Sequence, residues 1–226
     1  MTKRGIVVAI DGPAGAGKST VAKAVAKRLR YVHIDTGAMY RALTFKLLQA
    51  GVDISVEERV EQAIADYRID MMAEGDTFRV LVNDEDVTGH LRDAAVTAAV
   101  ATVSGYRAVR ELLFTEQRRL ARQGGVVMDG RDIGTVVFPQ AEVKIFLTAQ
   151  LEERARRRQI ELADRGILRD RTNIVQEIAA RDEADRRRPV SPLVQAPDAV
   201  LIDTTALSLD AVIERVLALC QSRMPE

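Results

Sequence analysis

The sequence predicts an α/β protein with a five-stranded parallel sheet flanked by helices, a small inserted antiparallel subdomain and a short helical lid. Short β-branched runs alternate with longer helical patterns, which is typical of β-α-β units around a parallel sheet. Residues 56–105 break this rhythm with closely spaced strand patterns joined by turn residues. The 226 residues fit one domain, and a composition with 47% hydrophobic and 29% charged residues excludes disordered, collagen-like and coiled-coil classes.

The elements of the parallel sheet follow from five short apolar runs and the helical stripes between them. A first helix is predicted after the first run because Val21, Val25 and Leu29 recur every four residues. Comparable stripes predict helices over residues 38–49, 109–122, 151–162, 174–186 and 209–219. The predicted strands are Ile6–Ile10, Val32–Ile34, Val126–Met128, Val143–Leu147 and Ala199–Ile202.

The inserted subdomain, residues 56–105, is predicted to be a small antiparallel sheet. Strands over Tyr67–Met72 and Phe78–Val82 are joined by a turn at Glu74-Gly75-Asp76, and Asn83-Asp84 offers a second turn into Glu85–Thr88. The remainder divides into a core (1–55, 106–150 and 190–226) and a lid region (151–189), with a hairpin predicted at Asp164-Arg165-Gly166.

The charge balance excludes a general attraction to nucleic acid or anionic membranes, since 33 basic and 33 acidic residues give a net charge of zero. Its distribution is uneven. Residues 1–51 hold 9 basic and 2 acidic residues, a net of +7, whereas residues 52–100 hold 4 and 12, a net of −8. Arginine outnumbers lysine 27 to 6, which is compatible with binding of phosphate groups.

The cysteine and histidine content and the hydropathy exclude further classes of protein. The single Cys220 excludes an internal disulfide framework, and His33 and His90 are too few for a histidine-based zinc centre, so both are interpreted as structural residues. No apolar run approaches the ~18 residues of a membrane span, and the apolar stretch after Thr2-Lys3-Arg4 stops at Asp11. A soluble cytoplasmic protein is therefore expected.

A phosphate-binding loop is the most specific motif in the chain. Gly12-Pro13-Ala14-Gly15-Ala16-Gly17-Lys18-Ser19 fits G-x-x-x-x-G-K-[ST], with a predicted strand before it and a helix after it. The glycines allow a tight turn whose N–H groups face phosphates, Lys18 adds a positive charge, and the Ser19 hydroxyl can ligate Mg²⁺. The guanine motif N/T-K-x-D is absent and the chain is short for a motor, which leaves a compact small-molecule kinase.

Three further clusters are candidate parts of a second binding site. Asp35–Arg41 leads into a helix that Thr36 is predicted to cap, with Arg41 one turn further along. Asp129–Thr135 follows a predicted strand, where ligands bind in open α/β sheets. The third cluster has Arg181, Asp185 and Arg188 at i, i+4 and i+7 on one helical face. Taken alone, this cluster and the Arg154–Arg158 run are more typical of solvated, salt-bridged helices.

In their order and residue identity these motifs resemble those of the bacterial cytidylate kinases. These enzymes are nucleoside monophosphate kinases with a P-loop kinase fold. The pair D-T-G-A-M-Y-R (35–41) and G-R-D-I-G-T-V-V-F-P (130–139) is specific, whereas the phosphate loop alone is widespread. The other matching segments are K-I-F-L (144–147), E-R-A-x-R-R (153–158), R-D-x-x-D (181–185) and A-x-x-I-D-T (199–204). The insert at 56–105 matches the extra subdomain of the bacterial enzymes.

The resemblance implies transfer of the γ-phosphoryl group of MgATP to CMP or dCMP by a monomer, with no nucleic-acid or membrane partner. It implies an ATP site at residues 12–20, to which Arg154 and Arg158 also contribute. It implies catalytic roles for Lys18, Arg131 and Arg181. It also implies Mg²⁺ near Ser19, with Asp129 or Asp132 orienting the water molecules bound to the metal. The implied CMP site comprises base-reading Thr36, Arg110, Asp132 and Arg188, ribose-binding Asp185, phosphate-binding Arg41 and Arg131, bridging Arg181, and Tyr40.

The chain also departs from the family pattern in three places. Ala101 stands where a base-reading serine is common, so Thr102 or Ser104 would have to compensate; Arg107 replaces a proline, and Arg186 replaces a small polar residue. Two rival functions remain open. One is a broader UMP/CMP kinase or another small-molecule kinase, and the other is a nucleic-acid-binding P-loop protein. Against the latter, residues 151–190 interleave 9 acidic with 11 basic residues, and the chain is only 4% aromatic.

Overall fold

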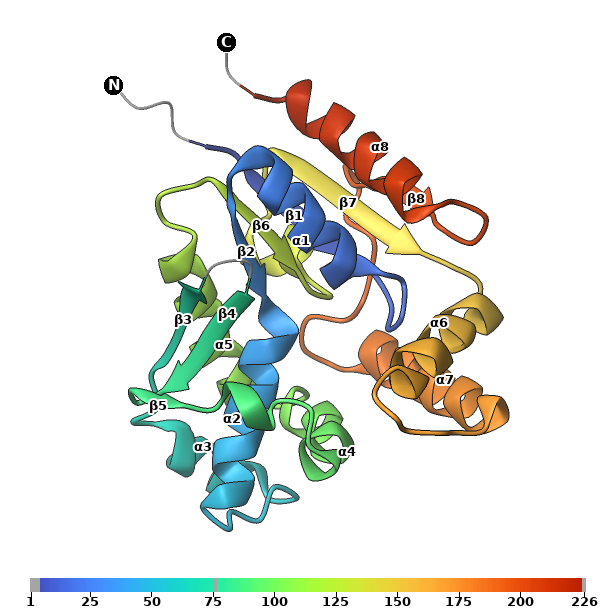
Figure 1. Ribbon diagram of the computed structural model, residues 1–226. Helices are drawn as coiled ribbons and strands as arrows, with labels where there is room; N and C mark the ends of the chain where they lie inside the picture. The colour runs from blue at the N-terminus through green and yellow to red at the C-terminus, as the bar shows by residue number, and fades with distance from the viewer. Residues whose placement is uncertain (1–4, 75–76, 225–226) are drawn as a thin grey trace. The chain divides into compact units, whose positions relative to one another are not determined.

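The computed structural model describes residues 5–74 and 77–224, and the chain forms two compact units (Figure 1). Unit 1 comprises residues 1–33 and 125–226, and unit 2 comprises residues 34–124. Unit 2 is therefore wider at both ends than the predicted insert at 56–105, and the functional division into core, insert and lid stays a prediction.

The parallel sheet confirms all five strands that the sequence predicts. Its order is β2-β6-β1-β7-β8, with β1 pairing in parallel with both β6 and β7, and β7 with β8. The carboxyl ends of the strands therefore share one edge, where Asp11 ends β1 and Asp129 ends β6. The strands are β1 Val7–Asp11, β2 Val32–Asp35, β6 Val126–Asp129, β7 Val143–Thr148 and β8 Val200–Asp203.

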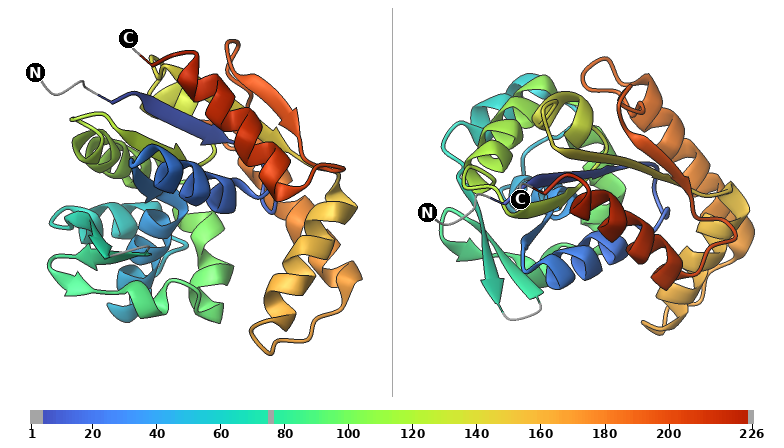
Figure 2. Two further views of the ribbon diagram at one scale, coloured as in Figure 1. Left: turned by 45° about the horizontal axis from the view of Figure 1, so that its top comes forward. Right: turned by 90° about the horizontal axis from the view of Figure 1, so that it is seen from above.

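Helices α1 (Lys18–Leu29) and α8 (Leu209–Gln221) contact each other and lie along the same face of this sheet (Figure 2). The stripe of Val21 and Val25 on α1 meets Val212 and Val216 of α8 and Ile145 of β7 in one buried cluster. Burial of this apolar surface fixes α1, and with it the loop that connects β1 to α1.

Helices α6 (Leu151–Ala163) and α7 (Arg171–Arg187) form the predicted hairpin, seen side by side in Figures 1 and 2. Gly166 in the turn has a positive φ of 74°, and the Asp170 carboxylate caps α7 by accepting the N–H groups of Thr172 and Asn173. Ala155, Leu162, Ile174 and Ile178 form a small buried cluster between the two helices.

Unit 2 contains a three-stranded antiparallel sheet, β3 (Ile69–Glu74), β4 (Thr77–Val82) and β5 (Glu85–Asp86), as predicted. Asn83 and Asp84 both have positive φ, as a two-residue hairpin turn requires. The predicted turn at Glu74-Gly75-Asp76 lies partly outside the described residues. The helices of unit 2 are α2 Thr36–Gln49, α3 Glu57–Ile64, α4 Ala94–Val103 and α5 Arg107–Leu120, with a short 3₁₀ turn at Thr88–His90.

Two of these helices, α3 and α4, were not predicted. The sequence of α4, AAVTAAVATV, is apolar or small on every side, so it has no polar face to give a helical period. It packs against α2, as does β4. None of the helices in the described ranges is long and apolar enough to cross a membrane.

Candidate active site

The phosphate loop connects β1 to α1 within unit 1, and its backbone requires glycine. Gly12, Gly15 and Gly17 have φ values of 145°, 75° and 89°. A Cβ on Gly12 would lie 1.9 Å from the carbonyl oxygen of Leu147 in β7, which excludes any side chain. Gly17 is the N-cap of α1 and offers no side-chain acceptor, so N–H groups of the first turn stay available for an anion. Ser19 and Thr20 are exposed in that turn.

Lys18 is buried beneath this loop, with 5% of its surface exposed. Its Nζ donates a hydrogen bond to the carbonyl oxygen of Pro13 at 2.7 Å. Burial, followed by repulsion from Arg131, lowers the pKa of Lys18 to about 7, although Asp129 acts in the opposite direction. Arg181 also repels it. Positive charges gathered in this way are stabilised by an anion, which is what nucleotide phosphates supply.

Ser19 on α1, Asp129 at the end of β6 and His33 on β2 form a hydrogen-bonded chain. The Ser19 Oγ donates to Oδ2 of Asp129 at 2.6 Å, and Oδ1 of Asp129 lies 2.7 Å from Nε2 of His33. Asp129 is 3% exposed. The structure thus brings together the two predicted metal-site residues, and it adds His33, which the sequence had suggested only as a structural residue.

Asp11, at the end of β1, holds the segment that follows Asp129. Its carboxylate accepts the N–H groups of Ile133 at 2.8 Å and Gly134 at 2.7 Å, in a π-helical turn spanning Ile133–Val137. Burial raises the pKa of Asp11 to about 6 despite these two hydrogen bonds, which lower it. This buried carboxylate, which no motif singled out, positions Arg131 and Asp132 through the backbone next to them.

Asp185 on α7 is the centre of an ionic cluster in unit 1. Its Oδ2 accepts from Nε of Arg131 at 2.8 Å, and its Oδ1 lies 3.5 Å from Nη1 of Arg188. Burial acts to raise the pKa of Asp185, but the charges of Arg131, Arg181 and Arg188 lower it below its usual value. Arg188 also lies 3.9 Å from Asp132. The four predicted residues Arg131, Asp132, Asp185 and Arg188 therefore form one group.

The helical-face prediction for Arg188 is wrong. Helix α7 ends at Arg187, and Arg188 has an extended backbone with φ −61° and ψ 141°. Its Nε donates to the carbonyl oxygen of Ser191 at 2.7 Å, so it reaches Asp185 from the following segment. Pro189 explains the early end of the helix, because a proline disfavours helical backbone in the residue before it.

The two lid arginines predicted to bind ATP have different surroundings. Arg154 is 5% exposed; its Nε donates to the carbonyl oxygen of Ala149, and its Nη1 reaches Ala14 and Asp182. Arg158 is partly exposed and pairs with Glu161 at 2.7 Å. Arg154 thus contacts the phosphate loop itself, while Arg158 lies one turn further along α6.

The predicted acceptor residues of unit 2 lie on α2 and α5. Asp35, not Thr36, caps α2: its carboxylate accepts the N–H of Ala38 at 3.1 Å, and buried Thr36 is the first residue of the helix. The prediction of Thr36 as cap is therefore wrong by one residue, because β2 runs into α2 without an intervening loop.

Arg110 is the most buried charged residue of unit 2, with 1% of its surface exposed. Its guanidinium lies 5.2 Å from the ring centroid of Tyr40 and 5.3 Å from that of Phe114, which stabilises its charge by cation–π interaction. Its Nη1 donates to the carbonyl oxygen of Ser104 at 2.9 Å. Arg41 on α2 donates to Oγ1 of Thr97 on α4 at 3.2 Å.

Comparison with known proteins shows the family to which the chain belongs. The profile of the family described as cytidylate kinase matches residues 8–222. A cytidylate kinase from Geobacillus kaustophilus (strain HTA426) is 54% identical over 222 residues, covering 98% of this chain and 99% of the relative. The chain belongs to the cytidylate kinase family. A second cytidylate kinase, from Geobacillus thermodenitrificans (strain NG80-2), is 53% identical with the same coverage.

A solved structure supports the fold of this cytidylate kinase family member and carries no functional information. It is a crystal structure of an uncharacterized protein from Eubacterium ventriosum ATCC 27560, with a TM-score of 0.52 at 12% identity, covering 96% of this chain and 99% of that chain.

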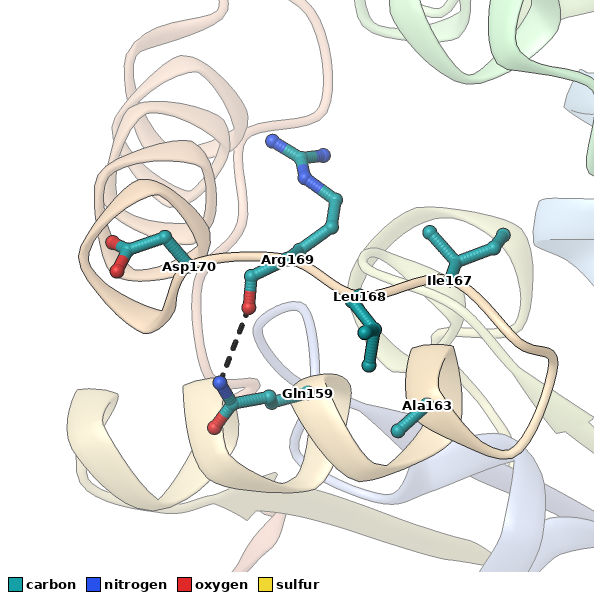
Figure 3. Close-up of a pocket in the computed structure, with 6 residues that line it drawn as sticks. All are labelled: Gln159, Ala163, Ile167, Leu168, Arg169 and Asp170. Carbon is teal, nitrogen blue, oxygen red and sulfur yellow. Dashed lines mark hydrogen bonds between the residues drawn. The ribbon is translucent and has the colours of Figure 1, made fainter.

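A cavity of about 390 Å³ lies outside this site, in the turn of the α6–α7 hairpin (Figure 3). Gln159 closes one side by donating to the carbonyl oxygen of Arg169 at 3.2 Å. Leu168 in the turn is 88% exposed. None of the predicted site residues lines the cavity, whose lining residues are Gln159, Ala163, Ile167, Leu168, Arg169 and Asp170.

Proposed function

We propose that this protein transfers the γ-phosphoryl group of MgATP to CMP or dCMP, forming ADP and CDP or dCDP. The observation that carries the proposal is the match to cytidylate kinases at more than half identity over nearly the full chain, with the phosphate loop in place. The cluster of Lys18, Arg131 and Arg181 supports it, because phosphoryl transfer needs cations around the migrating group.

Lys18, Arg131 and Arg181 would act mainly by positioning and charge neutralisation. The transition state of phosphoryl transfer is loose and spreads negative charge over the equatorial oxygens. A side-chain base is not required, since the acceptor oxygen of a nucleoside monophosphate is already anionic. Cations fixed before the reaction stabilise the developing charge without reorganising, and exclusion of water prevents its use as the acceptor.

The divalent metal that accompanies ATP is proposed to be Mg²⁺, held next to Ser19 and Asp129. The donor set fits, because a hydroxyl and a buried carboxylate 2.6 Å apart are the oxygen ligands that Mg²⁺ prefers. Mg²⁺ in such enzymes keeps several waters and uses one or two protein ligands together with substrate phosphates. When bound, the metal would neutralise phosphate charge and orient the donor. His33 would keep Asp129 directed at Ser19.

The CMP site is proposed to comprise the residues that the family resemblance implies. Thr36, Arg110, Asp132 and Arg188 would read the base, Asp185 would hold the ribose, and Arg41 and Arg131 would bind the acceptor phosphate. Arg181 would bridge to the transferring group, and Tyr40 would belong to the same site. The Ser104 hydroxyl donates to the carbonyl of Ala101 and its own carbonyl holds Arg110, so its part in base reading would be indirect. A monomeric state and a cytoplasmic location are also proposed.

A coupled assay of ADP release tests this function over CMP, dCMP, UMP, AMP, GMP and shikimate. We expect turnover with CMP or dCMP well above that with the other acceptors. A strong preference for any acceptor other than a cytidine nucleotide would support the alternative of a broader UMP/CMP kinase or another small-molecule kinase. Salt-sensitive RNA binding, together with no release of ADP from ATP with any of these acceptors, would refute the kinase proposal.

A further inference from the structure

The α6–α7 hairpin binds the phosphate loop through one buried ion pair. Arg154 on α6 and Asp182 on α7 lie 2.5 Å apart, with 6% and 3% of their side chains exposed. Both bind the same loop residue: Nη1 of Arg154 donates to the carbonyl oxygen of Ala14 at 2.9 Å, and Oδ1 of Asp182 accepts the Ala14 N–H at 3.2 Å. Both peptide groups of Ala14 are therefore held by the hairpin.

The loop also packs directly on the backbone of α6. A Cβ on Gly15 would lie 3.1 Å from Cβ of Arg154 and 3.3 Å from its carbonyl oxygen. Pro13, on the other side of Ala14, is held by Nζ of Lys18. The bend of the loop over residues 13–15 is thus fixed by protein groups, so a nucleotide does not have to order it on binding.

Asp182 sits next to a predicted catalytic residue. Arg181 precedes it in α7 and lies near enough to Lys18 to lower its pKa, and Asp185 follows one turn later. An anchor between Asp182 and Ala14 fixes the position of α7 along its axis relative to the loop. It therefore also sets the position of Arg181 on α7 relative to Lys18.

We propose that Asp182, together with Arg154, is a positioning residue that presets the phosphate loop and aligns α7 with it. The inference rests on the proposed function, because it assigns the loop to the donor nucleotide. A purely stabilising role fits the pair less well. Two buried charges cost much solvation energy, and apolar residues of similar size often give equal or greater stability.

The main test is the double variant Arg154→Met with Asp182→Leu, which removes both loop contacts and leaves no buried charge unpaired. Without nucleotide, we expect faster amide hydrogen exchange in residues 12–17 than in the wild type. We also expect ADP affinity, measured by calorimetry, to fall by at least about tenfold. The reason is that part of the free energy of ADP binding would then be used to order the loop. A melting temperature close to that of the wild type would show that the fold is intact.

A matched control separates positioning from stability. Ile178→Ala opens a cavity in the same hairpin, next to Ala155 and Ile174, without touching the loop. It should lower the melting temperature, yet leave ADP affinity within about twofold of the wild type. A loss of ADP affinity in this control as large as in the double variant would overturn the proposal.

A second variant tests the positioning role of Asp182 if the double variant does not fold. Asp182→Asn retains the shape and an acceptor for Ala14 but loses the ion pair with Arg154, and we expect ADP affinity to fall by about threefold or more. Unchanged ADP affinity and loop exchange in the folded variants would refute the proposal. Failure of the wild type to bind ADP would instead refute the proposed function, since the exchange comparison needs no nucleotide.

Discussion

The phosphate-loop region of unit 1 and the acceptor residues of unit 2 handle charge in opposite ways. In the loop region Lys18 is buried among other cations, and its pKa is lowered to about 7. In unit 2 the buried Arg110 is flanked by the rings of Tyr40 and Phe114 and bound to the carbonyl of Ser104. In the first arrangement the cations exceed the neighbouring carboxylates, so an anion would balance them, whereas in the second the charge is stabilised by two aromatic rings and a carbonyl group. The loop region should therefore respond more strongly to ligand and pH than unit 2.

The largest effect is expected for Lys18→Ala. Removing this charge should lower turnover on the order of 10³-fold, because preorganised cations contribute most to stabilising the transition state. The fold should remain intact, since the loss is confined to one hydrogen bond, from Lys18 to the carbonyl oxygen of Pro13. Steady-state ADP release and circular dichroism would measure the two effects. The exposed Lys23 on the same helix gives the control, Lys23→Ala, which should behave as the wild type. Near-normal rates in Lys18→Ala would refute the role of the loop.

Arg110→Met tests the acceptor side of the comparison. A hydrogen bond to a charged group is worth about 1.5–3 kcal/mol, so loss of the proposed base contact should raise KM for CMP by roughly 10- to 100-fold. KM for ATP should change little. The control is Arg107→Ala on the same helix, where the side chain is 70% exposed. If Arg110→Met left KM for CMP unchanged, Arg110 would be a structural residue and unit 2 would not read the base through it.

Asp185→Asn should give a smaller change. The amide keeps the shape of the side chain but loses the charge shared with Arg131 and Arg188, so KM for CMP should rise about tenfold. Asp185→Ala should weaken CMP binding further. Glu183→Gln, at an exposed ion pair with Arg187 on the same helix, is the matched control and should have no effect. An unchanged KM for CMP in both Asp185 variants would count against the ribose contact.

The same contrast explains which features the sequence could predict. The loop is a contiguous motif whose backbone geometry is set by Gly12, Gly15 and Gly17, so it was located with its flanking strand and helix. Helix α4 was missed because its alanine-rich sequence has no polar face. Asp35 and Thr36 are both good capping residues, and only the end of β2 decides between them. The helix α4 and the cap of α2 therefore depend on tertiary contacts, which residue spacing does not encode.

For single arginine side chains too, the sequence pattern does not distinguish a buried residue from an exposed one. The Arg154–Arg158 run has the pattern of a solvated helix, and Arg158 does pair with Glu161 near the surface. Arg154 differs because α6 turns it toward Ala14 and Asp182, where it is buried. Asp182 belongs to the R-D-x-x-D segment, but its spacing among acidic and basic neighbours assigns it no role. Its burial follows from the packing of α7 against α6, which depends on Ile174 and Ile178.

A pH dependence of stability isolates the charge of Lys18. Its pKa is about 7 in the folded protein and 10.5 as its ordinary value, so the unfolded chain binds more protons between these limits. The free energy of unfolding contributed by Lys18 should therefore increase as pH rises from 7 to 9, and the burial penalty should be fully present below pH 7. Melting temperatures at pH 7 and pH 9 would measure this for the wild type and Lys18→Ala. We expect the difference between the two proteins to shrink or reverse at pH 9, because neutral Lys18 is no longer costly to bury. A difference that stays constant across this range would show that Lys18 remains charged in the folded protein because Asp129 and Asp11 balance its charge without a nucleotide.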